Sequence, residues 1–313
     1  MSSPCLAAVF GLSNHHSLIH WELSIFTSIP FSFSIPPLLL PAYRALNSVL
    51  QFAGIRSMDN DFIEYPTGFG SEDIVAWGNT GMVCLDAASQ TVIKTPHDET
   101  HADSLQIERR IYERFQERGS YDGLLQYHGP FDRFGIRLEY APGFNLCSTL
   151  SKRTDIDPAQ RIRWVQQITE AVAFIHSVQV IHGDLTCSNI FLTKQLDAKL
   201  GDFGGSSLDG SDLLVAVTES HRYPGELLST HADIFALGSV IYHIMTGNAP
   251  YHSRSDNEID ELFQRGEFPS TTSLGLVGQV ITKCWQAKYD SAEDVRNDME
   301  GNGFLGLKPG PLY

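Results

Sequence analysis

The spacing of apolar residues changes once along the chain, from an alternating to a helical pattern, and this change restricts the fold more than any other feature. Apolar and polar residues alternate through 73–94 around turn signals at 78–79 and 87–90, which predicts three short antiparallel strands. Two further strands are predicted near 124–128 and 136–140. The first part of the chain is therefore expected to be rich in β-structure.

One helix is expected between these two groups of strands. Within residues 101–118, Ile107, Ile111 and Phe115 recur every four residues, and Gly119 ends the run. This spacing places the three apolar side chains on one face of a helix, which can pack against a sheet.

The residues that follow indicate mostly helices. Asp157 and Pro158 supply an N-cap and a preset backbone angle for a helix, whose apolar stripe consists of Trp164, Ile168, Val172 and Ile175. Residues 232–246 are apolar on nearly all sides, which predicts a buried helix. Strands first and helices later suggest an α+β chain with two lobes.

Charge is distributed unevenly along the 313 residues. The formal net charge is −15, but residues 1–57 contain only Glu22, Arg44 and Arg56, so residues 58–313 carry a net charge of −16. Surfaces that bind nucleic acids or anionic membranes need basic patches, and this acidity argues against a general binder of either kind. Five widely spaced cysteines without a CxxC pair disfavour a disulfide framework or a zinc site and fit a reducing, intracellular compartment.

The N-terminal fifth differs from the rest of the chain. Residues 23–43 contain no charged side chain and are long enough for a membrane span, but four prolines interrupt them. We interpret residues 1–57 as a non-catalytic extension. The alternatives are a membrane or targeting segment, or a misassigned start, in which case translation would begin at Met58. A cytoplasmic protein is expected, anchored to a membrane only if residues 23–43 insert.

Three residues supply the chemical groups that phosphoryl transfer needs. Asp184 and Asn189 lie five residues apart on one predicted loop, and Asp202 follows thirteen residues after Asn189. Carboxylate and amide oxygens are ligands that Mg²⁺ prefers, and a carboxylate beside them can orient an attacking hydroxyl. The alternative is that both aspartates are turn or cap residues.

These residues belong to two longer motifs, His-Gly-Asp at 182–184 and Asp-Phe-Gly at 202–204, which in this order resemble the eukaryotic protein kinase family. Similar His-Gly-Asp loops occur in divergent fungal kinase-like proteins. The resemblance implies a two-lobed protein kinase fold, with a small β-rich N-lobe that has one main helix and a larger, mostly helical C-lobe. It also implies that Asp184 is the catalytic base and that Asn189 and Asp202 bind Mg²⁺.

Residues upstream match further motifs of this family. Lys94 stands where the family places the lysine that contacts the α- and β-phosphates of ATP, and Glu108 stands where it places the glutamate that holds this lysine. The glycine-rich motif is partial, because Ala76 replaces its first glycine, whereas Gly78 and Gly81 remain. Alone, each piece could be ordinary: two solvated charges and a hairpin turn without a ligand.

The adenine site follows from the resemblance by position, with residues 138–141 similar to the hinge between the lobes. Leu138 would be the gatekeeper, and the backbone carbonyl of Glu139 and the backbone amide of Ala141 would hydrogen-bond adenine. Three apolar side chains would enclose the ring, those of Val83, Val92 and Phe191. Plain core packing is the alternative, since apolar residues usually have that role.

Two later landmarks also resemble the family. Pro-Gly-Glu at 224–226 stands where the family has Ala-Pro-Glu. Asp233, on the predicted buried helix, matches the aspartate that braces the catalytic loop, and backbone amides could satisfy its carboxylate.

The chain also departs from the family pattern. Gly183 replaces an arginine that usually pairs with a phosphate on the segment after Asp202, so activation by phosphorylation is less expected here. Thr186 replaces a lysine common in Ser/Thr kinases, and the loss of this lysine's charge could slow phosphoryl transfer. Tyr289 stands near the position of the arginine that usually pairs with Glu226.

The expected function is ATP- and Mg²⁺-dependent transfer of the γ-phosphoryl group to Ser or Thr hydroxyls of protein substrates, by a kinase without the usual arginine. One alternative is a pseudokinase scaffold that binds ATP weakly, which Ala76, Thr186 and Tyr289 favour. Another is a small-molecule phosphotransferase, because His-Gly-Asp also occurs in aminoglycoside and choline phosphotransferases. The expected partners are ATP and an unidentified protein substrate, without nucleic acid.

The resemblance covers about residues 72–298 and defines the expected domains. Residues 1–57 are the N-terminal extension, and residues 58–298 are the kinase domain, with an N-lobe at about 58–140 and a C-lobe at about 141–298. Residues 299–313 are a short tail.

Overall fold

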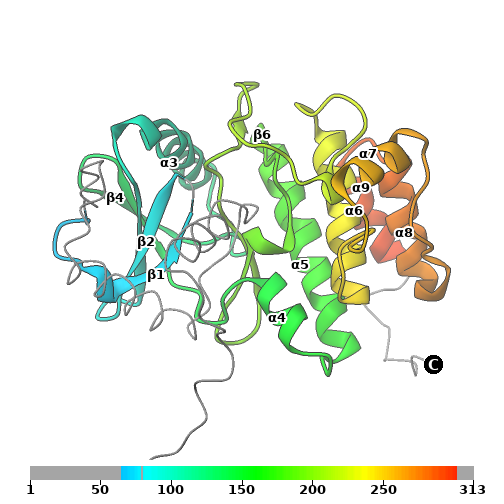
Figure 1. The fold of residues 1–313 in the computed structure, drawn as a ribbon, viewed down its shortest axis with the longest axis horizontal. Helices are drawn as coiled ribbons and strands as arrows, with labels where there is room; N and C mark the ends of the chain where they lie inside the picture. Colours follow the sequence, from blue (N-terminus) through cyan, green and yellow to red (C-terminus); the bar gives the residue numbers. More distant parts are fainter. Residues whose placement is uncertain (1–64, 79, 302–313) are drawn as a thin grey trace, which may run out of the picture.

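The computed structural model describes residues 65–78 and 80–301 of the chain. The interpretations of residues 1–57, including the uncharged stretch at 23–43 and a start at Met58, fall outside the described residues. Figure 1 shows a part built around a sheet beside a part built from helices, as the change in hydrophobic spacing predicts. The α+β, two-lobed fold class is therefore confirmed.

The N-lobe contains a five-stranded antiparallel sheet with the order β1-β2-β3-β5-β4. Its strands are β1 (Ile74–Trp77), β2 (Gly81–Asp86), β3 (Thr91–Pro96), β4 (Tyr127–Phe131) and β5 (Gly135–Glu139). All five lie within three residues of the predicted positions. The turn between β2 and β3 forms because the Asp86 carboxylate accepts hydrogen bonds from the amides of Ala88 and Ser89.

Helix α3 (Ala102–Glu117) packs against this sheet, as its four-residue apolar spacing predicts. Its buried face includes Ile107, Ile111 and Phe115. Asp98 begins the preceding 3-10 turn by accepting hydrogen bonds from two backbone amides, and Gly119 follows the helix with a φ of +110°. The sheet therefore holds α3 at a defined height beside β3.

The C-lobe consists mainly of six helices: α4 (Leu146–Lys152), α5 (Pro158–Ser177), α6 (Thr230–Thr246), α7 (Asp256–Gln264), α8 (Gly275–Trp285) and α9 (Ala292–Gly301). Asp157 caps α5 as predicted, by accepting a hydrogen bond from the Ala159 amide. Helix α6 lies among the other helices, and its residues 232–241 and 244 are buried. None of the helices in the described ranges is both long and apolar enough to cross a membrane.

The C-lobe also contains two short strand pairs, each separate from the five-stranded sheet. Strand β6 (Val180–Ile181) pairs with β9 (Ser207–Leu208), and β7 (Ile190–Leu192) pairs with β8 (Ala198–Leu200). The β7–β8 hairpin brings the residue before β7 close to the residues after β8. This geometry places Asn189 and the Asp-Phe-Gly motif at the junction of the two lobes.

Candidate active site

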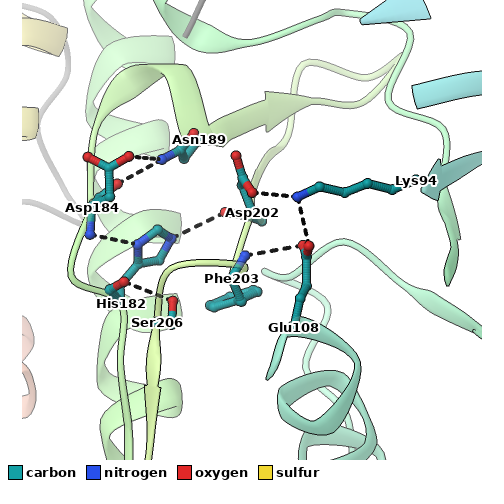
Figure 2. Close-up of polar contacts among 9 residues, drawn as sticks. Lys94, Glu108, His182, Asp184, Asn189, Asp202, Phe203 and Ser206 are labelled. Atoms are coloured by element: carbon teal, nitrogen blue, oxygen red, sulfur yellow. Dashed lines mark hydrogen bonds and ion pairs between the residues drawn. The ribbon is translucent and has the colours of Figure 1, made fainter. Parts of the chain in front are cut away.

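The loop between β6 and β7 contains the predicted base and one predicted metal ligand. The Asn189 side-chain amide donates hydrogen bonds to the Asp184 backbone carbonyl (2.8 Å) and to its carboxylate Oδ2 (3.0 Å). Figure 2 shows this pair facing the side of the site on which Asp202 lies. The five-residue spacing therefore does place the two side chains together.

Asp233 of α6 fixes the beginning of this loop. Its carboxylate accepts hydrogen bonds from the backbone amides of His182 (2.7 Å) and Gly183 (2.9 Å), and it contacts the His176 ring at 2.9 Å. Asp233 is 1% exposed. Burial alone would raise the pKa of its carboxyl, but the contacts with His176, His182 and the Gly183 amide hold that pKa below its ordinary value.

His182 lies at the centre of the loop as a neutral ring. Its Nδ1 accepts a hydrogen bond from the Asp184 amide, so its Nε2 is the atom that donates to the Gly201 carbonyl, at 3.2 Å. Burial lowers the pKa of this histidine, which keeps the ring uncharged. The ring therefore links the loop of Asp184 to the residue that precedes Asp202.

Lys94, Glu108 and Asp202 form one ion-paired group, although they come from β3, α3 and the segment after β8. The Lys94 ammonium lies 2.7 Å from Glu108 Oε2 and 2.5 Å from Asp202 Oδ1. Glu108 is fully buried, whereas the Asp202 side chain is 47% exposed. One oxygen of Glu108 also accepts a hydrogen bond from the Phe203 amide. The predicted pairing of Lys94 with Glu108 is thus present.

The residues after Asp202 bring α3 close to the C-lobe. The Phe203 ring is fully buried and packs edge-on against Tyr112 and Phe115 of α3. A Cβ at Gly204 would lie 2.5 Å from the Ser104 hydroxyl, so glycine permits this close approach. The aromatic packing and the glycine together hold Glu108 within reach of Lys94.

The charges of the site are unbalanced in favour of a cation. One lysine faces three carboxylates, those of Glu108, Asp184 and Asp202. Burial favours the neutral amine, but the carboxylates of Asp202 and Glu108 raise the pKa of Lys94. Burial also raises the pKa of Glu108, while the Lys94 charge holds the pKa of Asp202 below its ordinary value.

Asp184 shows where a further partner fits. Burial raises the pKa of its carboxyl to about 7, although the hydrogen bond from Asn189 acts to lower this pKa. The Thr218 hydroxyl also favours the charged form, yet Oδ1 is buried without a hydrogen bond of normal geometry from any described residue. An unsatisfied carboxylate oxygen beside an amide and a second carboxylate suits a hydroxyl group or a divalent cation.

Comparison with known families agrees with this geometry. The sequence model of the protein kinase domain matches residues 85–296, which is more than half of the chain. The chain belongs to the protein kinase family. The matched range of the kinase domain includes Lys94, Glu108, Asp184 and Asp202, and it begins after the glycine-rich turn.

Similar curated proteins include kinases of two specificities. The megakaryocyte-associated tyrosine-protein kinase of Rattus norvegicus is 26% identical over 58% of this chain and 40% of its own length. The RGS domain-containing serine/threonine-protein kinase A of Dictyostelium discoideum is 26% identical over 50% of this chain and 15% of its own. The serine/threonine-protein kinase plk-2 of Caenorhabditis elegans is 26% identical over 61% of this chain and 31% of its own length. The kinase domain therefore spans less than half the length of these relatives.

The two glycines predicted to cover phosphates have different surroundings. Gly78 and Gly81 close a tight turn, in which the Gly78 amide donates to the Gly81 carbonyl. A Cβ at Gly81 would lie 2.2 Å from the Thr95 carbonyl oxygen, so strand pairing alone requires this glycine. At Gly78 the nearest atom to such a Cβ is 3.7 Å away, and ligand approach stays a prediction for that residue.

The residues predicted to enclose adenine lie at the junction of the lobes. Val92 on β3 is directly opposite Leu138 on β5, and both are buried. Val83 and Phe191 are partly buried, and Ala141 is buried. The Glu139 side chain is held by Lys199 of β8 at 2.9 Å, which connects the predicted hinge to the strand before Asp202. Their contact with a nucleotide stays a prediction.

The surroundings of two further landmarks differ from each other. The Glu226 side chain is exposed and accepts a hydrogen bond from the Leu228 amide, so it is not buried against Tyr289. Tyr289 is buried and donates instead to Asp298, at 2.5 Å. Glu226 therefore lies at the surface, where its carboxylate does not need the arginine partner that the family usually provides.

Three residues near the site did not emerge from the sequence. His176 contacts Asp233, and His97 approaches the Gly78 carbonyl at 2.7 Å while stacking on Trp77. Arg114 reaches from α3 to the segment after β9. Only Arg114 left a signal in the sequence, a row of arginines at 110, 114 and 118.

Proposed function

We propose that this domain transfers the γ-phosphoryl group of ATP to a hydroxyl group of a protein substrate. The observation that carries the proposal is the joint arrangement of Lys94, held between Glu108 and Asp202, and Asp184, whose buried Oδ1 accepts no hydrogen bond of normal geometry from the described residues. Phosphoryl transfer depends on positioning and on charge stabilisation, and both groups serve those ends.

Each residue then has one task. The ammonium of Lys94, oriented by Glu108, binds phosphate oxygens and offsets the negative charge that develops on them. Oδ1 of Asp184 accepts a hydrogen bond from the attacking hydroxyl and takes its proton, while Asn189 keeps the carboxylate in place through Oδ2. Asp233 and His182 keep the loop from moving as the proton is transferred.

The donor set of the site suits a magnesium ion. Asp202 and Asn189 would hold Mg²⁺ through oxygen atoms, and the excess of three carboxylates over one lysine favours a divalent cation there. When bound, the ion supplies positive charge to the phosphate oxygens.

We propose Ser and Thr as the acceptors, because two of the three relatives described above are named serine/threonine-protein kinases. Because Gly183 stands where an arginine usually pairs with a phosphate, we propose that activity does not depend on phosphorylation of the segment after Asp202. The catalytic unit is proposed to comprise residues 58–298, with the lobes meeting near residue 140.

The test is transfer of label from γ-labelled ATP, with Mg²⁺, to a panel of generic protein acceptors, aminoglycosides and choline. The wild-type chain is expected to label proteins, and Asp184→Asn is expected to lower kcat about 10²–10⁴-fold. Asp155→Asn, at an exposed position far from the loop, is the matched control and should keep full activity.

Three results would contradict the proposal. Label confined to small molecules would indicate a small-molecule phosphotransferase. Binding of ATP, seen as a raised melting temperature without any transfer, would indicate a pseudokinase. Equal transfer by Asp184→Asn and the wild type would remove Asp184 from the role of base.

A further inference from the structure

Arg114 and Asp209 form a contact between α3 and the C-lobe that no catalytic task explains. The two guanidinium nitrogens of Arg114 donate to the two carboxylate oxygens of Asp209, at 2.9 Å and 2.7 Å. One of them also donates to the Val178 carbonyl, at 3.2 Å. Such a two-pronged pairing fixes direction as well as distance, which a lysine could not do.

Asp209 is held in place on the C-lobe side of this contact. It directly follows β9, its amide donates to the Gln179 carbonyl at 3.0 Å, and its φ is +55°. Strand β9 pairs with β6, which leads directly into His182 and the catalytic loop. Asp209 is therefore a fixed point next to the loop of Asp184, only seven residues after Asp202.

Arg114 lies on the same helix as Glu108, six residues further along. At 1.5 Å of rise per residue, the two positions are about 9 Å apart along the helix axis. Glu108 is tied near Lys94, and Phe203 packs on Tyr112, which lies between the two ties, and on Phe115, which directly follows Arg114. The sheet holds one face of α3, and two polar ties at separate positions along the helix restrict its tilt and rotation further.

We propose that the Arg114–Asp209 pair is a latch that sets the orientation of α3, and thereby the position of Glu108 against Lys94. Both are positioning residues, since neither touches the reacting groups. The latch uses two side chains of the unmodified chain and therefore needs no phosphate on the segment after Asp202. For its effect on transfer, the inference rests on the proposed function.

The experiment measures hydrogen exchange of α3 amides in the full chain without nucleotide, and kcat and KM with ATP and a protein acceptor. The variants are Arg114→Gln, Asp209→Asn and the two combined. Arg109→Gln is the matched control, because Arg109 pairs with Glu113 within the same helix. Each single variant is expected to speed α3 exchange and to lower kcat about tenfold, with KM unchanged.

The double variant should be no worse than the worse single variant, because both changes break the same pair. The melting temperature should fall by about 2 °C at most, as for the control, since partly exposed pairs contribute little to stability. The exchanged pair, Arg114→Asp with Asp209→Arg, should recover slow exchange and kcat in part, because an aspartate at 114 cannot donate to the Val178 carbonyl. Partial recovery excludes simple misfolding.

Unchanged α3 exchange in both single variants would overturn the latch, and so would an equal effect of Arg109→Gln. Faster exchange with an unchanged kcat would overturn its role in positioning Glu108. The failure of the proposed function looks different. In that case the wild type transfers no label, while the exchange measurement still decides whether the latch exists.

Discussion

The two halves of the active site are held together by different forces. On the N-lobe side, Lys94 and Glu108 come from separate elements and meet through ion pairs, one of which reaches the half-exposed Asp202. On the C-lobe side, the loop of Asp184 is fixed by hydrogen bonds from backbone amides to the buried Asp233. The charged half can be adjusted by small movements of α3, whereas the buried half depends on complete hydrogen bonding.

Substitutions in the two halves should therefore have different effects. Removing a charge from the N-lobe half should affect catalysis and leave the fold intact. Removing an acceptor from the C-lobe half should affect the fold itself, because a buried unsatisfied donor is costly.

The largest effect on stability is expected from Asp233→Asn. The new amide group would face backbone N–H groups or His176, and one of the buried donors would lose its acceptor. Breaking a buried charged network of this kind costs about 3–5 kcal/mol of unfolding free energy. Urea unfolding measures the loss, and Asp155→Asn should show almost none; equal stability of the two variants would refute the anchoring role.

Lys94→Met is expected to have the opposite profile. It removes the charge that acts on phosphate oxygens, so kcat should fall about 10²–10³-fold, as for loss of one electrostatic donor in other enzymes. The unfolding free energy should change by less than for Asp233→Asn, because burial already raises the pKa of Glu108, which can take up a proton once Lys94 is lost, and because Asp202 is half exposed. Urea unfolding and kcat, measured on the same preparation, would contradict the comparison if stability fell as far as in Asp233→Asn.

The smallest effect per residue is expected from acid, and it should act through the C-lobe. Burial lowers the pKa of His221 to about 3 and that of His243 to about 4, so the folded chain keeps both rings neutral. An unfolded histidine binds a proton near pH 6.5, so stability decreases as the pH falls below that value. Between pH 7 and 5, His221 alone accounts for about 2 kcal/mol of unfolding free energy.

His221→Gln should flatten this dependence, and His128→Gln, at an exposed position on β4, should leave it unchanged. The measurement is urea unfolding at pH 7, 6 and 5. A dependence as steep in His221→Gln as in the wild type would mean that other groups cause the acid sensitivity.

Much of the fold was predictable because local patterns determine it. The strands, α3, the Asp157 cap and the buried α6 follow from apolar spacing and from turn and cap residues, each readable within one element. Lys94 and Glu108 could be assigned because each lies on such an element, at a position that a known motif specifies.

What escaped prediction depends on residues that meet only after folding. Arg114 and Asp209 are 95 residues apart, and His176 and Asp233 are 57 apart. No local pattern states which row of charges on a helix will face which turn. Of the arginines at 110, 114 and 118 on α3, Arg114 meets Asp209 only because the segment after β9 packs beside this helix.

The anchoring of the loop by α6 has a consequence for the order of synthesis. During translation, the loop of Asp184 emerges from the ribosome before the helix that fixes it, since Asp233 lies 51 residues after His182. A nascent chain that ends before α6 already contains Asp184 but lacks the acceptor for the loop amides. The predicted base is thus made early, and its loop acquires its anchor only after α6 has been released.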